Sequence, residues 1–195
     1  MKRIFDIIAS SIGIILLFPV YLSIVLAIKL TSKGSFLYKQ KRVGVRGKDF
    51  YIFKFRTMYL DSDKKGLLTV GDKDPRVTYI GYYLRKFKLD ELPQLFNVLI
   101  GDMSIVGPRP EVRRYVDLYS PEDMIVLSIR PGITDYASIH FRNENEILKG
   151  SENPEQKYID EIMPIKLNLN KKYVQDKGFF KDILIIFKTF YSIIK

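Results

Sequence analysis

The longest apolar run of the chain lies near its N-terminus and predicts a membrane helix. Residues 7–28 include no charged side chain, and Lys29 ends the run. About 20 apolar residues of helix match the hydrocarbon core of a bilayer. A signal peptide has a shorter apolar segment followed by a small-residue cleavage site, and this run is not followed by one. We therefore expect a retained membrane anchor, with a buried core helix as the alternative.

Pro19 interrupts this run and leaves its topology open. A proline inside a helix removes a hydrogen bond and produces a kink. Basic residues flank both ends of the run, so the positive-inside rule gives no clear orientation. The flanking charged residues are Lys2, Arg3 and Asp6 before the run and Lys29 and Lys33 after it. Two topologies fit: a helix that dips into one leaflet and returns, or a kinked spanning helix, which hydropathy alone favours.

Short segments of mixed polarity follow the anchor. Residues 35–58 predict two strands joined by a basic, glycine-containing turn. In the second strand Lys54 and Arg56 share a face, because side chains two residues apart point the same way. These cations either project together into a site or are the solvated charges of an edge strand. Residues 60–78 are charged and rich in turn formers, and predict a surface loop.

Two short helices are predicted within residues 79–101 by the helical spacing of apolar residues. Asp90, Glu91 and Pro93 fall at the start of the second helix, which ends near Gly101. Proline is tolerated there because its missing N–H has no partner inside the helix.

A rigid loop is expected between a short strand and a helix in the next segment, residues 104–119. Pro108 and Pro110 both fix φ, so Arg109 lies on a backbone with little freedom. Arg130 precedes a second turn, of sequence Pro-Gly.

The C-terminal part of the chain predicts further helices. Residues 143–170 are polar and expected to be partly helical, and residues 178–195 place apolar side chains on one helical stripe with lysines beside it. The stripe consists of Ile183, Ile186, Phe187, Phe190 and Ile194. This pattern is typical of an interfacial helix on a membrane, and a core-packing helix is the alternative.

Composition narrows the partners. The chain has 195 residues, 47% of them hydrophobic, and a formal net charge of +10, which indicates one ordinary domain that meets polyanions or anionic surfaces. Nucleic acid, phosphorylated small molecules and anionic lipid all fit this charge. The sequence has no cysteine, so disulfides and thiolate metal sites are excluded.

Asp90 and Glu91 are conspicuous side by side in so basic a chain. Either Asp90 caps a helix and Glu91 complements its dipole, or the helix N-terminus keeps a carboxylate ionised as a nucleophile or Mg²⁺ ligand. The nearby Gly-Pro-Arg-Pro loop favours the second interpretation, because rigid arginines bind phosphate oxygens as forks. Positioning and charge neutralisation dominate phosphoryl transfer. The sequence lacks a P-loop motif.

The motifs resemble one protein family closely. KRIFDIIASSIGIILLFPV, KFRTM, DPRVTYIGYYLRKFKLDELPQLFNVLIGDMSIVGPRPE and RPGIT occur in this order. They resemble the bacterial sugar transferases, specifically the small, monotopic polyprenol-phosphate phosphoglycosyl transferases. The resemblance covers Lys2 to about Thr134 and, weakly, the tail.

The resemblance implies a fold and a location. We expect an α+β protein with a re-entrant membrane helix at residues 1–30, despite the hydropathy preference for spanning. A small cytosolic catalytic domain of helices and short strands follows at residues 31–195 and ends in an amphipathic interfacial helix. Such a protein lies on the cytosolic face of the bacterial inner membrane, contacts membrane lipid, and is compatible with a homodimer.

The resemblance also implies an activity. Members transfer a sugar phosphate from a UDP-sugar to undecaprenyl phosphate and release UMP, with Mg²⁺ and a covalent intermediate on the aspartate. Carried over, Asp90 is the nucleophile, Glu91 positions the metal or assists the acceptor, and both are candidate metal ligands. Candidate phosphate-binding residues are Lys54, Arg56, Arg85, Arg109, Arg130 and Arg142. The rival hypotheses are a non-catalytic membrane-surface adaptor on anionic lipid and a nucleic-acid-binding protein, and we expect no nucleic-acid partner because no such motif is seen.

Departures from the family pattern cluster after RPGIT. Asp135, Tyr136 and His140 replace family residues, which leaves the sugar and nucleotide recognised open, and His140 is expected to have a surface or packing role. Residues 144–164 look longer than in small relatives, and an added lid or interaction helix is one interpretation. Asp182 is predicted to pair with Arg142 and hold the tail against the core.

Overall fold

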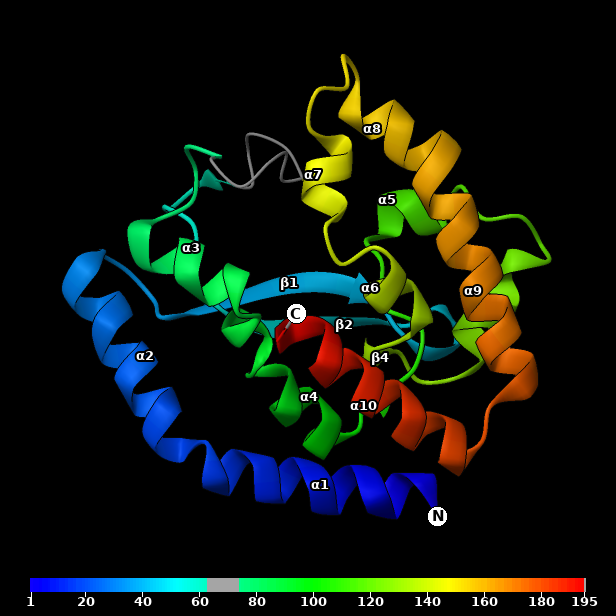
Figure 1. The fold of residues 1–195 in the computed structure, drawn as a ribbon, viewed down its shortest axis with the longest axis horizontal. Coiled ribbons are helices and arrows are strands. Elements are labelled where there is room, and N and C mark those ends of the chain that lie inside the picture. The colour runs from blue at the N-terminus through cyan, green and yellow to red at the C-terminus, as the bar shows by residue number, and fades with distance from the viewer. Residues whose placement is uncertain (63–73, 195) are drawn as a thin grey trace.

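The computed structural model describes residues 1–62 and 74–194, and the predicted loop at residues 60–78 lies mostly outside this part. The α+β prediction is confirmed: helices surround two small sheets (Figure 1). Strand β1, Leu37–Val43, pairs antiparallel with β2, Asp49–Phe55. Strand β3, Ser104–Val106, pairs parallel with β4, Gly132–Thr134. The α-helices are α1 Lys2–Leu16, α2 Phe18–Thr31, α3 Tyr79–Lys86, α4 Gln94–Ile100, α5 Arg113–Val116, α6 Tyr136–His140, α7 Glu144–Leu148, α8 Pro154–Lys157, α9 Met163–Asp176 and α10 Phe179–Ile194.

The N-terminal apolar run forms two helices rather than one. Helices α1 and α2 meet at Leu17 with a bend of 60°, and Pro19 lies in the first turn of α2, as expected for a proline that begins a helix. Among the described residues no single helix meets the length and hydropathy required to cross a bilayer, whereas this bent pair meets them jointly. The predicted break near Pro19 is therefore confirmed.

The polar N-terminal residues of α1 fasten this helix to the domain. Arg3 donates to the carbonyls of Val98 and Leu99 at the C-terminal end of α4. The buried Asp6 carboxylate accepts from the Ser104 hydroxyl and the Ile105 N–H, both at 3.1 Å. These side chains are interior contacts of the protein and not only charges that flank an apolar run.

Helix α2 packs beside the strand β2 and helix α3. Ile24 and Ile28 form a buried cluster with Phe55 and Leu84. Beyond the end of the helix, Arg56 donates to the carbonyls of Ser32 and Lys33. The helix pair is thus bound to the domain at both ends (Figure 1).

The segment that begins at α7 contributes to the main hydrophobic core. Leu148, Tyr158, Ile162 and Met163 are buried there against Val112, Tyr115 and Val126. A π-helical turn, Tyr158–Ile162, connects α8 to α9. The interpretation of residues 144–164 as an added lid is therefore wrong, because a lid would not carry buried core side chains.

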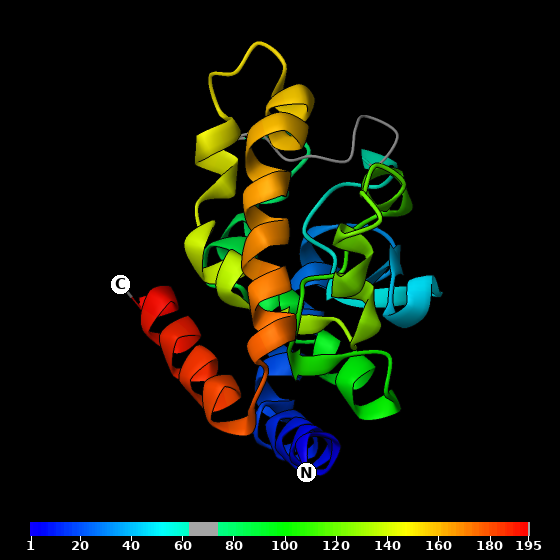
Figure 2. The ribbon, with the colours of Figure 1, turned by 90° about the vertical axis from the view of Figure 1, so that its right-hand side faces the viewer.

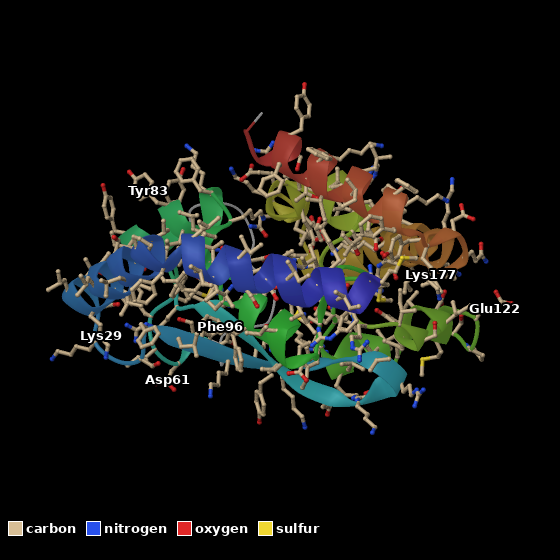
Figure 3. The ribbon with its side chains drawn as sticks, turned by 90° about the horizontal axis from the view of Figure 1, so that it is seen from below. Lys29, Asp61, Tyr83, Phe96, Glu122 and Lys177 are labelled. Carbon is tan, nitrogen blue, oxygen red and sulfur yellow. The ribbon has the colours of Figure 1, made fainter. Side chains whose placement is uncertain are left out.

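The first turn of α10 lies beside the N-terminal end of α1 (Figures 2 and 3), where the rings of Phe5 and Phe179 meet edge to face at 5.4 Å. Its inner face buries Ile185 and Asp182, while Phe187 and Phe190 are exposed. The predicted stripe is therefore divided between a core-packing face and an outward apolar face.

The predicted pairing of Asp182 with Arg142 is wrong. Asp182 forms an ion pair with Lys2 and accepts a hydrogen bond from the Tyr173 hydroxyl at 2.6 Å. Lys2 also donates to the Val106 carbonyl at 2.9 Å. These polar contacts connect α1, β3, α9 and α10.

Candidate active site

The Asp-Glu pair lies on an irregular turn before α4. Lys88 adopts a left-handed backbone (φ 55°), uncommon for a residue with a side chain. Leu89–Glu91 then form one 3₁₀ turn, and Pro93 is the N-cap of α4 without a side-chain cap bond. Asp90 therefore does not cap this helix, and the capping interpretation fails.

Asp90 is buried beneath this turn. The residue is only 8% exposed, and its Oδ1 has no hydrogen-bond partner among the described residues. Burial and the neighbouring Glu91 raise the pKa of Asp90, and Lys54 and Arg85 offset this only in part. From the sequence, the helix terminus is expected to keep Asp90 ionised and so to lower its pKa. This expectation is wrong in direction, because desolvation has the larger effect and raises the pKa.

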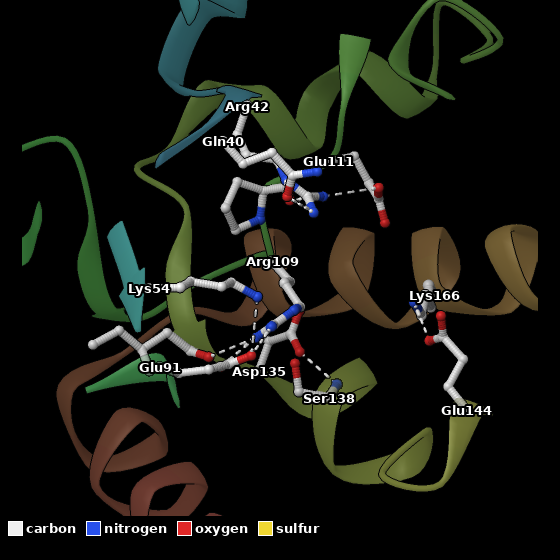
Figure 4. Close-up of polar contacts among 12 residues, drawn as sticks. Gln40, Arg42, Lys54, Glu91, Arg109, Glu111, Asp135, Ser138, Glu144 and Lys166 are labelled. Carbon is white, nitrogen blue, oxygen red and sulfur yellow. Dashed lines mark hydrogen bonds and ion pairs between the residues drawn. The ribbon is translucent and has the colours of Figure 1, made fainter. Parts of the chain in front are cut away.

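Glu91 has the opposite electrostatic setting. Arg109 donates to both carboxylate oxygens of Glu91 through its two terminal nitrogens, Nη1 and Nη2. Lys54 Nζ lies 3.4 Å from Glu91 Oε1 (Figure 4). Burial alone would raise the pKa of Glu91, but Arg109 and Lys54 together hold it well below its usual range. In return Glu91 raises the pKa of Arg109, whereas burial lowers the pKa of Lys54 despite the ion pair. Two adjacent carboxyl groups are thus driven apart in acidity.

Two hydrogen bonds of Arg109 hold its loop against residues 133–135. The Arg109 N–H donates to Asp135 Oδ2 at 2.9 Å, and the Arg109 Nη1 donates to the Ile133 carbonyl at 3.3 Å. Gly107 and Gly132 let the two proline-containing turns touch, since a Cβ on Gly132 would lie 2.1 Å from the Gly107 nitrogen. The two motifs singled out in the sequence therefore form one packed unit behind Arg109.

The other predicted phosphate-binding residues are spread over the molecule. Arg85 on α3 is close enough to Asp90 to affect its pKa. Arg56 is buried and bound to main-chain carbonyls at the end of α2, and exposed Arg130 donates to the Gly101 carbonyl at 2.9 Å. Arg142 follows α6. In the described part of the chain, Lys54 and Arg109 form hydrogen bonds or ion pairs with Glu91 of the dyad. A phosphate role stays a prediction for all six residues.

Two polar residues near the site were not predicted to act there. Asp135 is fully buried and also accepts from the Ser138 N–H at 2.6 Å, as the N-cap of α6. A capping pattern in the sequence could have identified it. Gln94, four residues after Asp90, is fully buried, and neither amide atom has a partner among the described residues. Nothing in the local sequence signals this.

The dyad partly fits a magnesium ion. Among residues 1–62 and 74–194 there is no cluster of three or more acidic or histidine side chains. Mg²⁺ needs fewer, because it is commonly held by one or two carboxylates together with substrate phosphates and water. The unpaired Oδ1 of Asp90 suits such a ligand, whereas both oxygens of Glu91 are taken by Arg109 and Lys54.

Comparison with known proteins places this geometry in a family. A family model described as "Bacterial sugar transferase" matches residues 1–195. The chain therefore belongs to the bacterial sugar transferase family, as the motifs predicted.

Relatives of the chain are named as sugar-phosphate transferases. It is 38% identical, over 100% of its own length and 44% of the relative, to a UDP-N-acetylgalactosamine-undecaprenyl-phosphate N-acetylgalactosaminephosphotransferase of Aeromonas hydrophila. It is 35% identical to a UDP-glucose:undecaprenyl-phosphate glucose-1-phosphate transferase of Escherichia coli, over 98% of the chain and 40% of the relative. It is 34% identical to the exopolysaccharide production protein ExoY of Rhizobium meliloti, over 96% of the chain and 83% of the relative. The chain thus spans less than half of the first two relatives, and these two are named for different sugars.

Proposed function

We propose that the chain transfers a sugar-1-phosphate from a UDP-sugar to undecaprenyl phosphate, through a covalent intermediate on Asp90, as a membrane step of polysaccharide synthesis. The observation that carries this is the buried Asp90 carboxyl, which lies beside the Arg109–Glu91 pair and whose Oδ1 has no hydrogen-bond partner within residues 1–62 and 74–194. A buried carboxylate that lacks a partner costs free energy, and a reacting phosphorus atom gives this oxygen a use. The family and the names of its members support the same chemistry.

In the first step the Asp90 carboxylate attacks the β-phosphorus of the UDP-sugar. The bond between this phosphorus and the bridging oxygen breaks, and UMP leaves with that oxygen. The product is an acyl phosphate in which Asp90 carries the phosphosugar. Only the carboxylate form of Asp90 attacks, and burial beside Glu91, which raises the pKa of Asp90, makes this carboxylate a better nucleophile.

In the second step a phosphate oxygen of undecaprenyl phosphate attacks the same phosphorus. The bond to Asp90 breaks, the carboxylate is regenerated, and the lipid diphosphosugar is released. Asp90, together with the substrate phosphates, would hold Mg²⁺, which would supply charge neutralisation for the diphosphate.

Arg109 and Lys54 are the cations placed to receive phosphate oxygens. Both are bound to Glu91 in the free protein. An incoming diphosphate therefore competes with the Glu91 carboxylate for two cations that are already positioned. Glu91 thereby keeps two buried cations ordered until the donor arrives.

We propose further that α1 and α2 form a re-entrant anchor that enters one leaflet from the cytosolic side. Arg3 and Asp6 bind the domain near the start of α1, and Arg56 binds it just beyond α2. Since the domain itself lies on one side of the bilayer, both ends of the pair lie there too. The outward residues of the pair are apolar and exposed, which suits lipid contact: Ile4, Ile8, Ile12, Ile15, Leu16, Phe18, Leu22, Leu26 and Leu30.

The test is incubation of the detergent- or lipid-solubilised protein with Mg²⁺ and a panel of UDP-sugars, without acceptor. We expect one donor to release UMP and to add the mass of one phosphosugar to the intact protein. The Asp90→Asn variant should do neither. Normal UMP release and a phosphosugar adduct in Asp90→Asn would overturn the proposal and favour another nucleophile, and absence of UMP release with every donor would favour the adaptor hypothesis.

A further inference from the structure

A second polar network holds the Arg109 loop from the side opposite the dyad (Figure 4). Arg42 of β1 donates through Nη1 to the Pro110 carbonyl at 3.1 Å, and the same nitrogen lies 3.5 Å from the Glu111 carboxylate. The Glu111 carbonyl in turn accepts from the Val43 N–H at 2.9 Å. Pro110 and Glu111, the two residues after Arg109, are therefore tied to the end of β1.

Tyr158 extends this network to the C-terminal half of the chain. The residue is 2% exposed, and its hydroxyl donates to Glu111 Oε1. It is also the first residue of the π-helical turn Tyr158–Ile162. Such turns are rare inside helices and often occur at functional sites, because they redirect side chains.

Tyr158 is itself held in place on both sides. Lys166 Nζ lies 4.9 Å from the centre of its ring and pairs with Glu144. The Tyr115 ring packs against the Tyr158 ring, with 4.9 Å between the two ring centres. Burial and Glu111 raise the pKa of Tyr158, so its hydroxyl keeps the proton that it donates.

We propose that Tyr158 is a positioning residue, which acts through Glu111 to fix the Pro-Arg-Pro loop and so the guanidinium of Arg109. Without the tyrosine proton, the half-buried Glu111 carboxylate would take a stronger bond from Arg42. Nη1 of Arg42 lies 3.5 Å from this carboxylate and now serves the Pro110 carbonyl. The loop would lose that tether. The kinetic part of this inference rests on the proposed function.

The chain offers a matched pair of variants for the test. Tyr158→Phe removes the hydroxyl bound to Glu111 and keeps the ring. Tyr115→Phe removes a hydroxyl that is buried without a partner among the described residues, from the adjacent ring of the same cluster. Both variants keep the aromatic packing, so both are expected to fold.

Two measurements are made on each variant and on the wild type. The first is hydrogen exchange at the amides of Val43 and Arg109, which are bonded to Glu111 and Asp135 across the loop. The second is the rate of UMP release from the UDP-sugar. We expect Tyr158→Phe to exchange faster and to lose about tenfold in kcat/KM, whereas Tyr115→Phe matches the wild type in both.

A double-mutant cycle separates positioning through Glu111 from a general loss of packing. If Tyr158 acts through Glu111, Tyr158→Phe has little further effect on UMP release in a Glu111→Gln background. An equal loss in both backgrounds would overturn the inference, and so would exchange in Tyr158→Phe that matches Tyr115→Phe. A wild-type protein that releases no UMP would refute the proposed function, while the exchange comparison would still decide whether Tyr158 orders the loop.

Discussion

Asp90 and Glu91 are neighbours in sequence, and their pKa values shift in opposite directions because their partners differ. Glu91 meets two cations, whereas Asp90 meets burial and a negative neighbour. Titratable pairs whose pKa values are driven apart commonly divide chemical roles between them. Here Glu91 is bound to two cations, and the proposed mechanism assigns the reaction to Asp90.

The pH dependence of the first half-reaction should report Asp90. Only its carboxylate attacks, and its pKa is raised, so the acidic limb of kcat/KM should lie above the ordinary aspartate value of about 3.9. Glu91 stays ionised through this range and adds no limb. The measurement is the UMP burst without acceptor, so that the acceptor phosphate does not titrate. A limb at or below the ordinary value would contradict the structure.

Asp90→Asn should stabilise the protein while it abolishes turnover. A carboxyl with a raised folded-state pKa contributes stability only below its unfolded pKa, and this contribution is lost as the pH rises through the folded pKa. Each unit between the two pKa values is worth about 1.4 kcal/mol. The variant should therefore melt higher than wild type at pH 8, and the difference should shrink toward pH ~4. Exposed Asp117 gives the control, since Asp117→Asn should show no such trend.

Arg109→Lys should separate the fork from the charge. Lysine keeps the cation and loses the two-pronged grip on Glu91. We expect UMP release to fall about 100-fold, a typical cost of one lost phosphate-stabilising contact. Arg114→Lys is the matched control, because Arg114 is exposed and pairs with Glu155 away from the dyad. Equal losses in the two variants would remove Arg109 from the site.

For single residues, the sequence predicted which residues form the site better than it predicted the directions of their pKa shifts. The dyad, Lys54 and Arg109 could be chosen from motif and loop stiffness. The direction of the Asp90 pKa shift could not, because desolvation depends on what packs over a side chain, and nothing local encodes that. For the same reason Tyr158 and Asp135, which come from distant segments, were not assigned to the Arg109 loop.

Among elements, periodicity predicted what forms and missed what each element contacts. The break near Pro19, the β1–β2 hairpin and the helices α3 and α4 follow from local pattern. The docking of α1 through Lys2, Arg3 and Asp6 does not, because its partners lie about a hundred or more residues away. A short-range pattern therefore showed these residues only as flanking charges.

The Lys2–Asp182 pair predicts a measurable link between α1 and α10. Lys2→Met leaves a buried carboxylate with Tyr173 as its remaining partner, and we expect a loss of about 1–3 kcal/mol, since Lys2 itself is partly exposed. Adding Asp182→Asn should recover part of this loss. Thermal unfolding in detergent measures it. Lys181→Met, which breaks only the exposed pair with Asp176, should change stability by less than about 0.5 kcal/mol.

For the molecule as a whole, the re-entrant topology gives a direct labelling experiment. The chain has no cysteine, so single cysteines can be placed at exposed Met1 and Ser35 and at Phe18 beside the bend. In spheroplasts a membrane-impermeant maleimide should label neither of the first two, and it should label both once the membrane is opened. Phe18→Cys should stay protected in both conditions. Labelling of one end alone in intact spheroplasts would show that the pair spans the bilayer.

The contact between residues 2 and 182 also has a consequence for biosynthesis. Lys2 leaves the ribosome 180 residues before its partner, so α1 and α2 lack this contact while the rest of the chain is translated. Synthesis at 5–20 residues per second makes this interval at least several seconds. The nascent protein therefore needs lipid, or a chaperone, to shield the apolar residues of α1 and α2 before α10 is synthesised and Asp182 can bind Lys2.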